Sequence, residues 1–247
     1  MPVQTKRGCS FGCIYCCYPL LEGREWRLRE PEWVAAQMRE AALAGMRGVE
    51  FVDSVFNFPA DHTVECMEVI AKTQSRWSRP WLSTFEGNPV ATSPELIDAM
   101  NAAKFSAVGV TAESGSEAML DALGKGFTTD HLSRAREDLR RLRARKIWVF
   151  MLGGPGETEA TIRETASFLK SLPRGDVAQV TYEVRVLPRT ELRRRLVEEK
   201  EVAEGDELVD PTFYWSPRVM GLRGRCVAFP WDMSIISLSR ASLGERL

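Results

Sequence analysis

Short apolar runs alternate with amphipathic stretches along most of the chain. Each run has the length of a buried strand, and each is followed by apolar residues at helical spacing. Strands are predicted at 2–6, 49–53, 81–85, 106–111, 147–152 and 177–186. Helices are predicted at 31–44, 60–72, 94–103, 129–143, 157–172 and 191–200. The pattern therefore consists of strand–helix units repeated along the chain.

This alternation predicts an α/β fold with a parallel sheet, because parallel neighbours need a crossover connection between them. The units can form an open doubly wound sheet or an incomplete barrel, and periodicity alone does not separate the two. In both architectures the functional site lies at the carboxyl ends of the strands.

Polar and glycine-rich clusters follow the predicted strands and would lie together at that edge. The first strand runs into a cysteine-rich loop. The later clusters are Asp53–Asn57, Glu86–Pro89, Glu113–Ser116, Gly153–Glu157, and Arg185 with Pro188. One site at the rim of the sheet is the prediction.

Composition and charge are those of an ordinary globular protein. The chain has 247 residues, of which 44% are hydrophobic and 27% charged. The net charge of −1 gives no general attraction for nucleic acid or an anionic membrane. No apolar run has the roughly 18 residues of a membrane span, and the first residues lack the apolar core of a signal peptide. We expect a cytoplasmic protein with no nucleic-acid partner and no membrane span.

The alternation stops near Gly205. We predict a barrel domain at 1–204 and a C-terminal extension at 205–247 that closes or flanks the barrel. Two cysteines, Cys66 and Cys226, are isolated in the sequence, and we expect both to be buried apolar thiols.

The remaining cysteines carry the clearest chemical signal. Cys9, Cys13 and Cys16 form a C-x3-C-x2-C run. Three thiolates can bind zinc and leave its fourth position open, or they can bind three irons of a [4Fe–4S] cluster and leave one iron open. Cys17 is adjacent to Cys16, so its side chain would leave the loop in another direction, and we do not expect it to be a ligand.

With Tyr15 before its last cysteine, this run resembles the signature of radical S-adenosylmethionine (radical SAM) enzymes. Other segments are similar to the subgroup whose members usually carry an N-terminal cobalamin-binding domain. These segments are Val3–Cys9, Glu113–Ser116, Lys125–Thr128, Gly153–Thr158 and Arg185–Leu192. The resemblance covers about residues 3 to 217.

The resemblance implies a partial (β/α)6 TIM-like barrel. Cys9, Cys13 and Cys16 would ligate a [4Fe–4S] cluster, and its open iron would bind S-adenosylmethionine. An electron from a donor such as flavodoxin or ferredoxin would cleave this cofactor reductively. The resulting 5′-deoxyadenosyl radical would serve hydrogen abstraction or methyl transfer on a small-molecule substrate.

The resemblance also assigns cofactor-binding residues. Asp53 and Ser54 would bind the methionine amino group, although Asp53 would equally suit a cap or an Asx turn. Glu113 and Ser114 would bind the ribose hydroxyls, with helix capping by a serine as the alternative. Asn88, in the cluster after the third strand, is also a candidate.

Three further positions complete this set. Gly153 and Gly154 would let the backbone approach adenine or ribose, or they form a plain strand-to-helix turn. Arg185 is costly to bury in an apolar strand unless paired, and a cofactor carboxylate or a nearby glutamate would pair it. Tyr15 would lie near adenine or pack against the loop.

The sequence departs from the subgroup in one respect. It lacks the D-x-H-x-x-G signature of a cobalamin-binding domain, so the chain is a stand-alone radical enzyme or a fragment, or cobalamin arrives on a cobalamin-binding subunit. The alternative hypothesis is a non-catalytic iron–sulfur or zinc-binding partner subunit, a degenerate or truncated relative. About four irons with sulfide per chain would favour the enzyme, and one zinc the alternative.

Overall fold

The computed structural model describes residues 1–73, 81–222 and 235–238. Its centre is a parallel seven-stranded sheet. In spatial order the strands are β1 (Pro2–Val3), β4 (Gly48–Phe51), β5 (Trp81–Gly87), β6 (Phe105–Glu113), β7 (Arg145–Leu152), β8 (Val177–Tyr182) and β11 (Ile235–Leu238).

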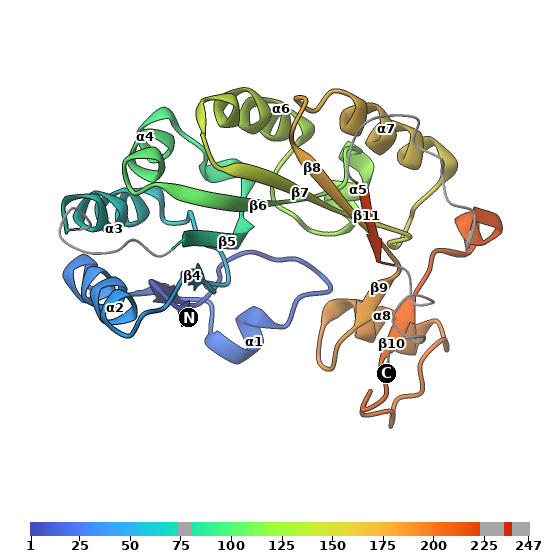
Figure 1. Ribbon diagram of the computed structural model, residues 1–247. Coiled ribbons are helices and arrows are strands. Elements are labelled where there is room, and N and C mark those ends of the chain that lie inside the picture. Colours follow the sequence, from blue (N-terminus) through green and yellow to red (C-terminus); the bar gives the residue numbers. More distant parts are fainter. Residues whose placement is uncertain (74–80, 223–234, 239–247) are drawn as a thin grey trace.

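The spatial order of these strands is also their order in the chain. A doubly wound sheet would reverse that order at a switch point between its two halves. This sheet winds in one direction, as a barrel does, and stays open, with β1 at one edge and β11 at the other (Figure 1). The partial barrel expected from the sequence is confirmed.

Helices cover the convex side of the sheet (Figure 1). They are α2 (Pro31–Leu43), α3 (Ala60–Thr73), α4 (Pro94–Ala102), α6 (Thr129–Asp138) and α7 (Glu159–Lys170). Local sequence explains where some begin: Pro31 needs no N–H partner in the first turn, and the Ser93 hydroxyl accepts from the N–H of Leu96 at 3.2 Å. Within the described ranges, no helix is long and apolar enough to cross a bilayer.

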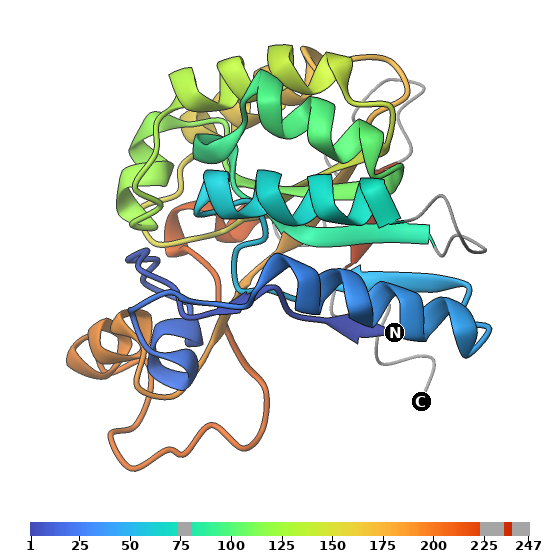
Figure 2. The same cartoon turned by 90° about the vertical axis from the view of Figure 1, so that its left-hand side faces the viewer.

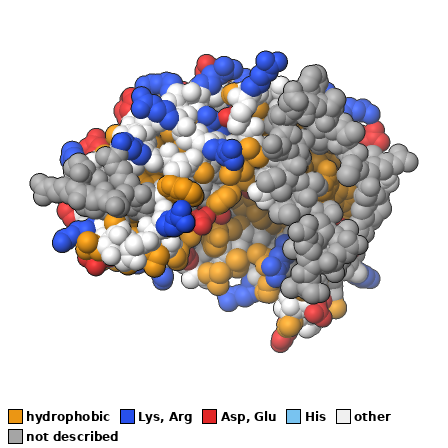
Figure 3. Space-filling view, viewed as in Figure 1, with side chains coloured by type: hydrophobic (Ala, Val, Ile, Leu, Met, Phe, Trp, Pro, Cys, Tyr) orange, Lys and Arg blue, Asp and Glu red, His pale blue; other side chains and the backbone are white. Residues whose placement is uncertain are grey.

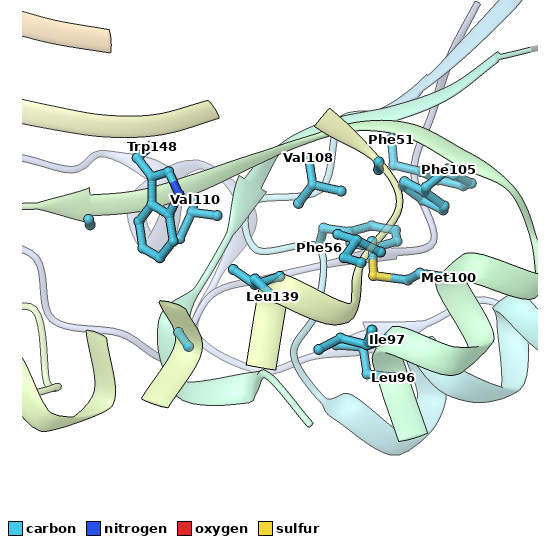
Figure 4. Packing of buried hydrophobic residues seen from close by; sticks show 14 of the residues in the cluster. Phe51, Phe56, Leu96, Ile97, Met100, Phe105, Val108, Val110, Leu139 and Trp148 are labelled. Carbon is cyan, nitrogen blue, oxygen red and sulfur yellow. The ribbon is translucent and has the colours of Figure 1, made fainter. Parts of the chain in front are cut away.

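The main core lies between the sheet and these helices. Along β6, Val108, Val110 and Ala112 belong to this core, and Thr111 and Glu113, which alternate with them, line a cavity instead. Aromatic rings fill the same layer beside β4 and β6, and the Phe51 and Phe105 rings stack with centroids 5.7 Å apart (Figure 4). The other face of the strands is thereby left to line a concave site.

Several short elements were not predicted. The cysteine loop lies between a two-stranded ribbon, β2 (Lys6–Arg7) with β3 (Arg27–Leu28), and the short helix α1 (Tyr18–Glu22). Helix α5 (Glu117–Ala122) follows β6. The expected strand at 177–186 is broken at Glu183, whose φ of 72° ends β8 and starts β9 (Val184–Val186).

Parts of the predicted C-terminal extension pair with strands of the preceding domain. Strand β10 (Thr212–Tyr214) pairs antiparallel with β9, and β11 adds to β8. The division at residue 204 stays a prediction. Cys66 is fully buried, as expected, whereas Cys226 lies outside the described residues.

Candidate cofactor site

The cysteine loop is fastened to the barrel by backbone hydrogen bonds. The N–H of Cys9 donates to the carbonyl of Gly23 at 3.0 Å. In the middle of the loop, the N–H of Ile14 donates to Leu123 at 3.0 Å, and its carbonyl accepts from Leu192 at 2.9 Å. Leu123 lies at the C-terminal end of α5, and Leu192 belongs to α8 (Glu191–Glu198). Helix α8 lies with α1 at the end of the molecule away from the N-terminus (Figure 2). The loop is therefore held at the carboxyl ends of the strands.

Cys9, Cys13 and Cys16 line one cavity of about 340 Å³. Its other walls come from strand ends and from the loops that follow them. These residues are Phe11, Tyr15, Tyr18, Ser54, Val55, Phe85, Glu86, Asn88, Thr111, Glu113, Lys125, Val149 and Gln179. Seen from the side of Figure 1, hydrophobic side chains gather around a hollow in the middle of the molecule (Figure 3).

The donor set fits an iron–sulfur cluster. Cys9 is buried, and Cys13 and Cys16 are partly exposed, and all three line the same cavity. Burial raises the pKa of the Cys16 thiol to about 12 and also raises that of Cys9, so metal binding has to displace their protons. In the described part of the chain, no three His, Cys, Asp or Glu side chains form a group suited to a single metal ion. A cluster with one thiolate at each of three irons matches the set better than one zinc ion does.

Tyr15, Glu113 and Lys125 form a connected polar group in the cavity wall. The Tyr15 hydroxyl donates to Glu113 Oε1 at 3.0 Å, and Lys125 Nζ donates to the Tyr15 hydroxyl at 3.1 Å. Lys125 Nζ lies 3.4 Å from Glu113 Oε1, and both side chains are buried. Burial is the largest single effect on the pKa of Lys125 and lowers it, but the negative charges of Glu113, Cys13 and Glu86 and the hydrogen bond to Glu113 together raise that pKa above its ordinary value. The lysine is therefore a buried cation at the cavity.

Glu113 also has an unusual backbone. It ends β6 with a φ of 62°, in the left-handed region that disfavours residues with a side chain. The register between β6 and β7 shifts at the same place. Strain of this kind persists where surrounding contacts hold a side chain in position. Here the contacts from Tyr15 and Lys125 hold the carboxylate in the cavity wall.

Glu86 faces the same cavity from the end of β5. Burial raises the pKa of its carboxyl to about 7, and the charge of Glu113 adds to the effect while Lys125 opposes it. The carboxyl can therefore carry or release a proton near neutral pH.

The structure brings Tyr15, Ser54, Asn88 and Glu113 of the predicted residues into this cavity with the three cysteines. The Ser54 hydroxyl donates to Glu22 at 2.5 Å, and the Asn88 side chain accepts from the N–H of Val90 at 2.9 Å.

Asp53 and Ser114 lie outside the cavity lining. Asp53 is 1% exposed and accepts hydrogen bonds from Thr5 and Lys6. The Ser114 hydroxyl lies 2.9 Å from that of Thr165 in α7. Each side chain thus has a structural partner, and the cofactor role suggested for it stays a prediction.

Gly153, Gly154 and Arg185 also lie outside the lining. A Cβ on Gly153 would come within 2.3 Å of the Trp215 ring, and its φ is 90°. A Cβ on Gly154 would meet the Met119 methyl at 3.1 Å. Arg185 is exposed on the ribbon of β9 and β10, so it needs no buried partner, and the cofactor role suggested for it stays a prediction. The strand break at Glu183 is the reason for this exposure, because it turns β9 out of the main sheet.

Several residues of the cavity wall were not assigned to the site from the sequence, among them Glu86, Thr111, Lys125 and Gln179. Lys125 lies within a segment used for the resemblance, and Glu86 lies in the polar cluster after the third strand. Thr111 and Gln179 are polar positions inside apolar strands, where alternation would have placed them opposite the core.

The fold and the cavity define a class, that of partial parallel barrels with a three-cysteine loop at the carboxyl ends of the strands. The family model of the radical SAM superfamily matches residues 3–169, and the chain belongs to this superfamily. Membership implies a [4Fe–4S] cluster and S-adenosylmethionine as cofactors.

Curated relatives match over most of the chain. An uncharacterized methyltransferase from Pyrococcus horikoshii is 27% identical over 180 residues, which is 72% of this chain and 38% of the relative. A tRNA-2-methylthio-N(6)-dimethylallyladenosine synthase from Pelobacter propionicus is 27% identical over 190 residues, 74% of this chain and 43% of the relative. The chain therefore spans less than half the length of these two relatives.

Solved structures support the fold. The radical S-adenosylmethionine methyltransferase TsrM from Kitasatospora setae matches with a TM-score of 0.76 at 20% identity, over 90% of this chain and 49% of TsrM. The cobalamin-dependent S-adenosylmethionine radical enzyme OxsB matches with a TM-score of 0.66 at 16% identity, over 87% of this chain and 38% of OxsB. At these identities the likeness shows the shared barrel.

Proposed function

We propose that this chain is a radical SAM enzyme acting by hydrogen abstraction or methyl transfer on a small-molecule substrate. The main support for the proposal is that Cys9, Cys13 and Cys16 line the same cavity as the Tyr15–Glu113–Lys125 group. A non-catalytic subunit would need the thiols but would have no use for a buried, ionisable wall beside them.

The chemistry of each residue suggests its role. Cys9, Cys13 and Cys16 would hold the cluster. When bound, the cluster and S-adenosylmethionine supply one-electron cleavage of the sulfonium carbon–sulfur bond, which yields methionine and a 5′-deoxyadenosyl radical that takes a hydrogen atom from the substrate. Lys125 offers a cation to an anionic group, and Glu113 offers an acceptor to hydroxyl or ammonium groups.

The apolar part of the wall has a separate task. Val55, Phe85 and Val149 line the cavity beside the polar group. Apolar side chains at this place keep water away from a reactive intermediate and strengthen the electrostatic contacts of the neighbouring charges.

The partners follow from the same chemistry. A one-electron donor such as flavodoxin or ferredoxin would reduce the cluster, in a cytoplasmic setting. Methyl transfer is supported by relatives and structural neighbours named as methyltransferases, and cobalamin would then be bound outside these 247 residues, by a further domain or by a cobalamin-binding subunit. The net charge of −1 supports a small molecule over tRNA, the substrate in the names of other relatives.

The test is product formation under anaerobic conditions. The protein is reconstituted with iron and sulfide, reduced with dithionite and given S-adenosylmethionine, and 5′-deoxyadenosine is measured by mass spectrometry. We expect product from the wild type and none from Cys13→Ser. A wild-type protein that loads about four irons and forms no 5′-deoxyadenosine with any reductant would refute the proposal. One zinc per chain without sulfide would favour the non-catalytic alternative.

A further inference from the structure

Asp53 is enclosed by the start of the cysteine loop. Its Oδ1 accepts from the N–H of Thr5 at 2.7 Å and from the N–H of Lys6 at 2.9 Å. Its Oδ2 accepts from the Thr5 hydroxyl at 3.2 Å. With a 1% exposed side chain, both oxygens are engaged away from the cavity.

Lys6 completes the same network from the other side. Its side chain is 1% exposed, and Nζ lies 4.0 Å from Asp53 Oδ2. Nζ also donates to the Thr5 hydroxyl at 2.7 Å and to the carbonyl of Phe56 at 2.6 Å. The pair therefore ties residues 5 and 6 to the loop that leaves β4. Buried charges of this kind keep a fixed geometry because each loses its partner if either moves.

The backbone between this network and Cys9 is held by close contacts and hydrogen bonds. Gly8 has a φ of 102°, and a Cβ there would lie 2.0 Å from the carbonyl oxygen of Glu25. The N–H of Arg29 donates to the carbonyl of Thr5 at 2.9 Å, and β2 pairs with β3 over the next two residues. Cys9 itself is fixed through its N–H. A shift at residues 5 and 6 is thus passed on to the Cys9 thiol.

We propose that Asp53 and Lys6 are positioning residues that set the Cys9 end of the cluster-binding loop, and that Asp53 does not contact S-adenosylmethionine. The inference rests on the proposed function only in taking Cys9 as a cluster ligand. It replaces the cofactor role suggested for Asp53 by the sequence with a role that reaches Cys9 through the backbone of residues 5 to 8. Groups bonded directly to a metal ligand typically change metal affinity by about 10- to 100-fold when mutated, and we expect the lower end of that range here.

The test compares two Asp–Lys pairs whose aspartates are buried, in the reconstituted protein. Asp53→Asn removes the charge that faces Lys6. Asp176→Asn is the matched control, because Asp176 is 5% exposed, pairs with Lys146 at 3.4 Å and accepts from the Trp148 indole at 3.0 Å, at the opposite ends of the strands. Iron loss to a ferrous chelator, the reduction potential and electron paramagnetic resonance of the cluster, and S-adenosylmethionine affinity are measured for each.

We expect Asp53→Asn to lose iron about 10-fold faster than the wild type and to shift the reduction potential, with S-adenosylmethionine affinity per remaining cluster within about 2-fold. Asp176→Asn should lower thermal stability without either change. Lys6→Met added to Asp53→Asn removes the stranded ammonium and should restore part of the iron retention. If Asp53→Asn does not fold, Thr5→Val weakens the same network with one hydroxyl and should show the same pattern in smaller measure.

Two outcomes would overturn the inference. Wild-type iron retention with a tenfold or greater loss of cofactor affinity would make Asp53 a cofactor ligand. Equal iron loss in Asp53→Asn and Asp176→Asn would make its role one of general stability. Neither readout needs turnover, so a wild type that cleaves no cofactor would refute the proposed function and leave this comparison intact.

Discussion

Lys125 Nζ lies 3.4 Å from Glu113 Oε1, and this pair joins the loop after α5 to the end of β6. Both side chains are buried in the wall of the cavity that holds the cysteines. A buried pair of this kind adds little net stability but makes each partner depend on the other. We therefore expect that removing one partner destabilises the protein more than removing both charges does.

Lys125→Met should lower the free energy of unfolding by about 3 kcal/mol, because it leaves the Glu113 carboxylate buried beside only a tyrosine hydroxyl. Urea unfolding at pH 7 measures the loss. Lys72→Met is the control, since Lys72 pairs with Glu68 at 3.6 Å on an exposed helix face, and its change should stay within about 0.5 kcal/mol. Glu113→Gln added to Lys125→Met should recover part of the loss. Equal losses for Lys125→Met and Lys72→Met would contradict the dependence.

Gly153→Ala should destabilise the protein more than Gly154→Ala. At Gly153 the new methyl meets a rigid Trp215 ring at 2.3 Å and the backbone has a φ of 90°, whereas at Gly154 it meets the mobile end of Met119 at 3.1 Å. We expect a loss of about 2–3 kcal/mol for Gly153→Ala and about 1 kcal/mol or less for Gly154→Ala. Thermal melts of the two variants check the order. Similar melting temperatures would mean that Trp215 moves aside without cost.

Local pattern was enough to predict much of the barrel from the sequence. Apolar runs such as Ile147–Leu152 form buried strands wherever their neighbours are helical, and capping serines such as Ser93 mark helix starts. The strand break at Glu183 escaped prediction because a positive φ in a glutamate has no sequence signal. The exposure of Arg185 follows from that break, so it could not be predicted from the sequence either.

The gathering of the three cysteines at one site and the outline of that site were also within reach of the sequence, because both depend on spacing and strand ends. The sequence did not predict which side chains at the strand ends enter the cavity. Asp53 and Ser54 are adjacent, yet Asp53 points back to Thr5 and Lys6 while Ser54 lines the cavity. Lys125 reaches the site only because α5 and its following loop carry it there, and α5 was itself unpredicted.

Cys17→Ser should leave iron loading unchanged, whereas Cys9→Ser, Cys13→Ser and Cys16→Ser should each reduce it well below the wild-type value of about four per chain. Cys17 occupies the N-cap position of α1, where its side chain makes no capping hydrogen bond, and it is not part of the cavity wall. Iron and sulfide analysis after anaerobic reconstitution gives the comparison. Loss of iron in Cys17→Ser equal to that in Cys16→Ser would make Cys17 a ligand.

Glu86 predicts a pH dependence of stability with a definite sign. Its pKa in the folded protein is raised to about 7 by burial first and by Glu113 second, so the folded state binds this proton more tightly than the unfolded state does. The resulting stabilisation is full below the ordinary carboxyl pKa of about 4.3 and is lost as the pH rises through 7.

Glu86→Gln should remove this dependence, because the amide resembles the protonated acid and does not titrate. Between pH 5 and 8, the free energy of unfolding of the wild type should fall by about 2 kcal/mol relative to that of Glu86→Gln, a figure reduced for the partial exposure of the side chain. Urea unfolding of both proteins at pH 5, 6, 7 and 8 tests the prediction. If the free energies of unfolding of the two proteins change in parallel with pH, Glu86 ionises freely in the cavity. If the wild type instead loses stability relative to Glu86→Gln as the pH falls, the predicted sign is wrong.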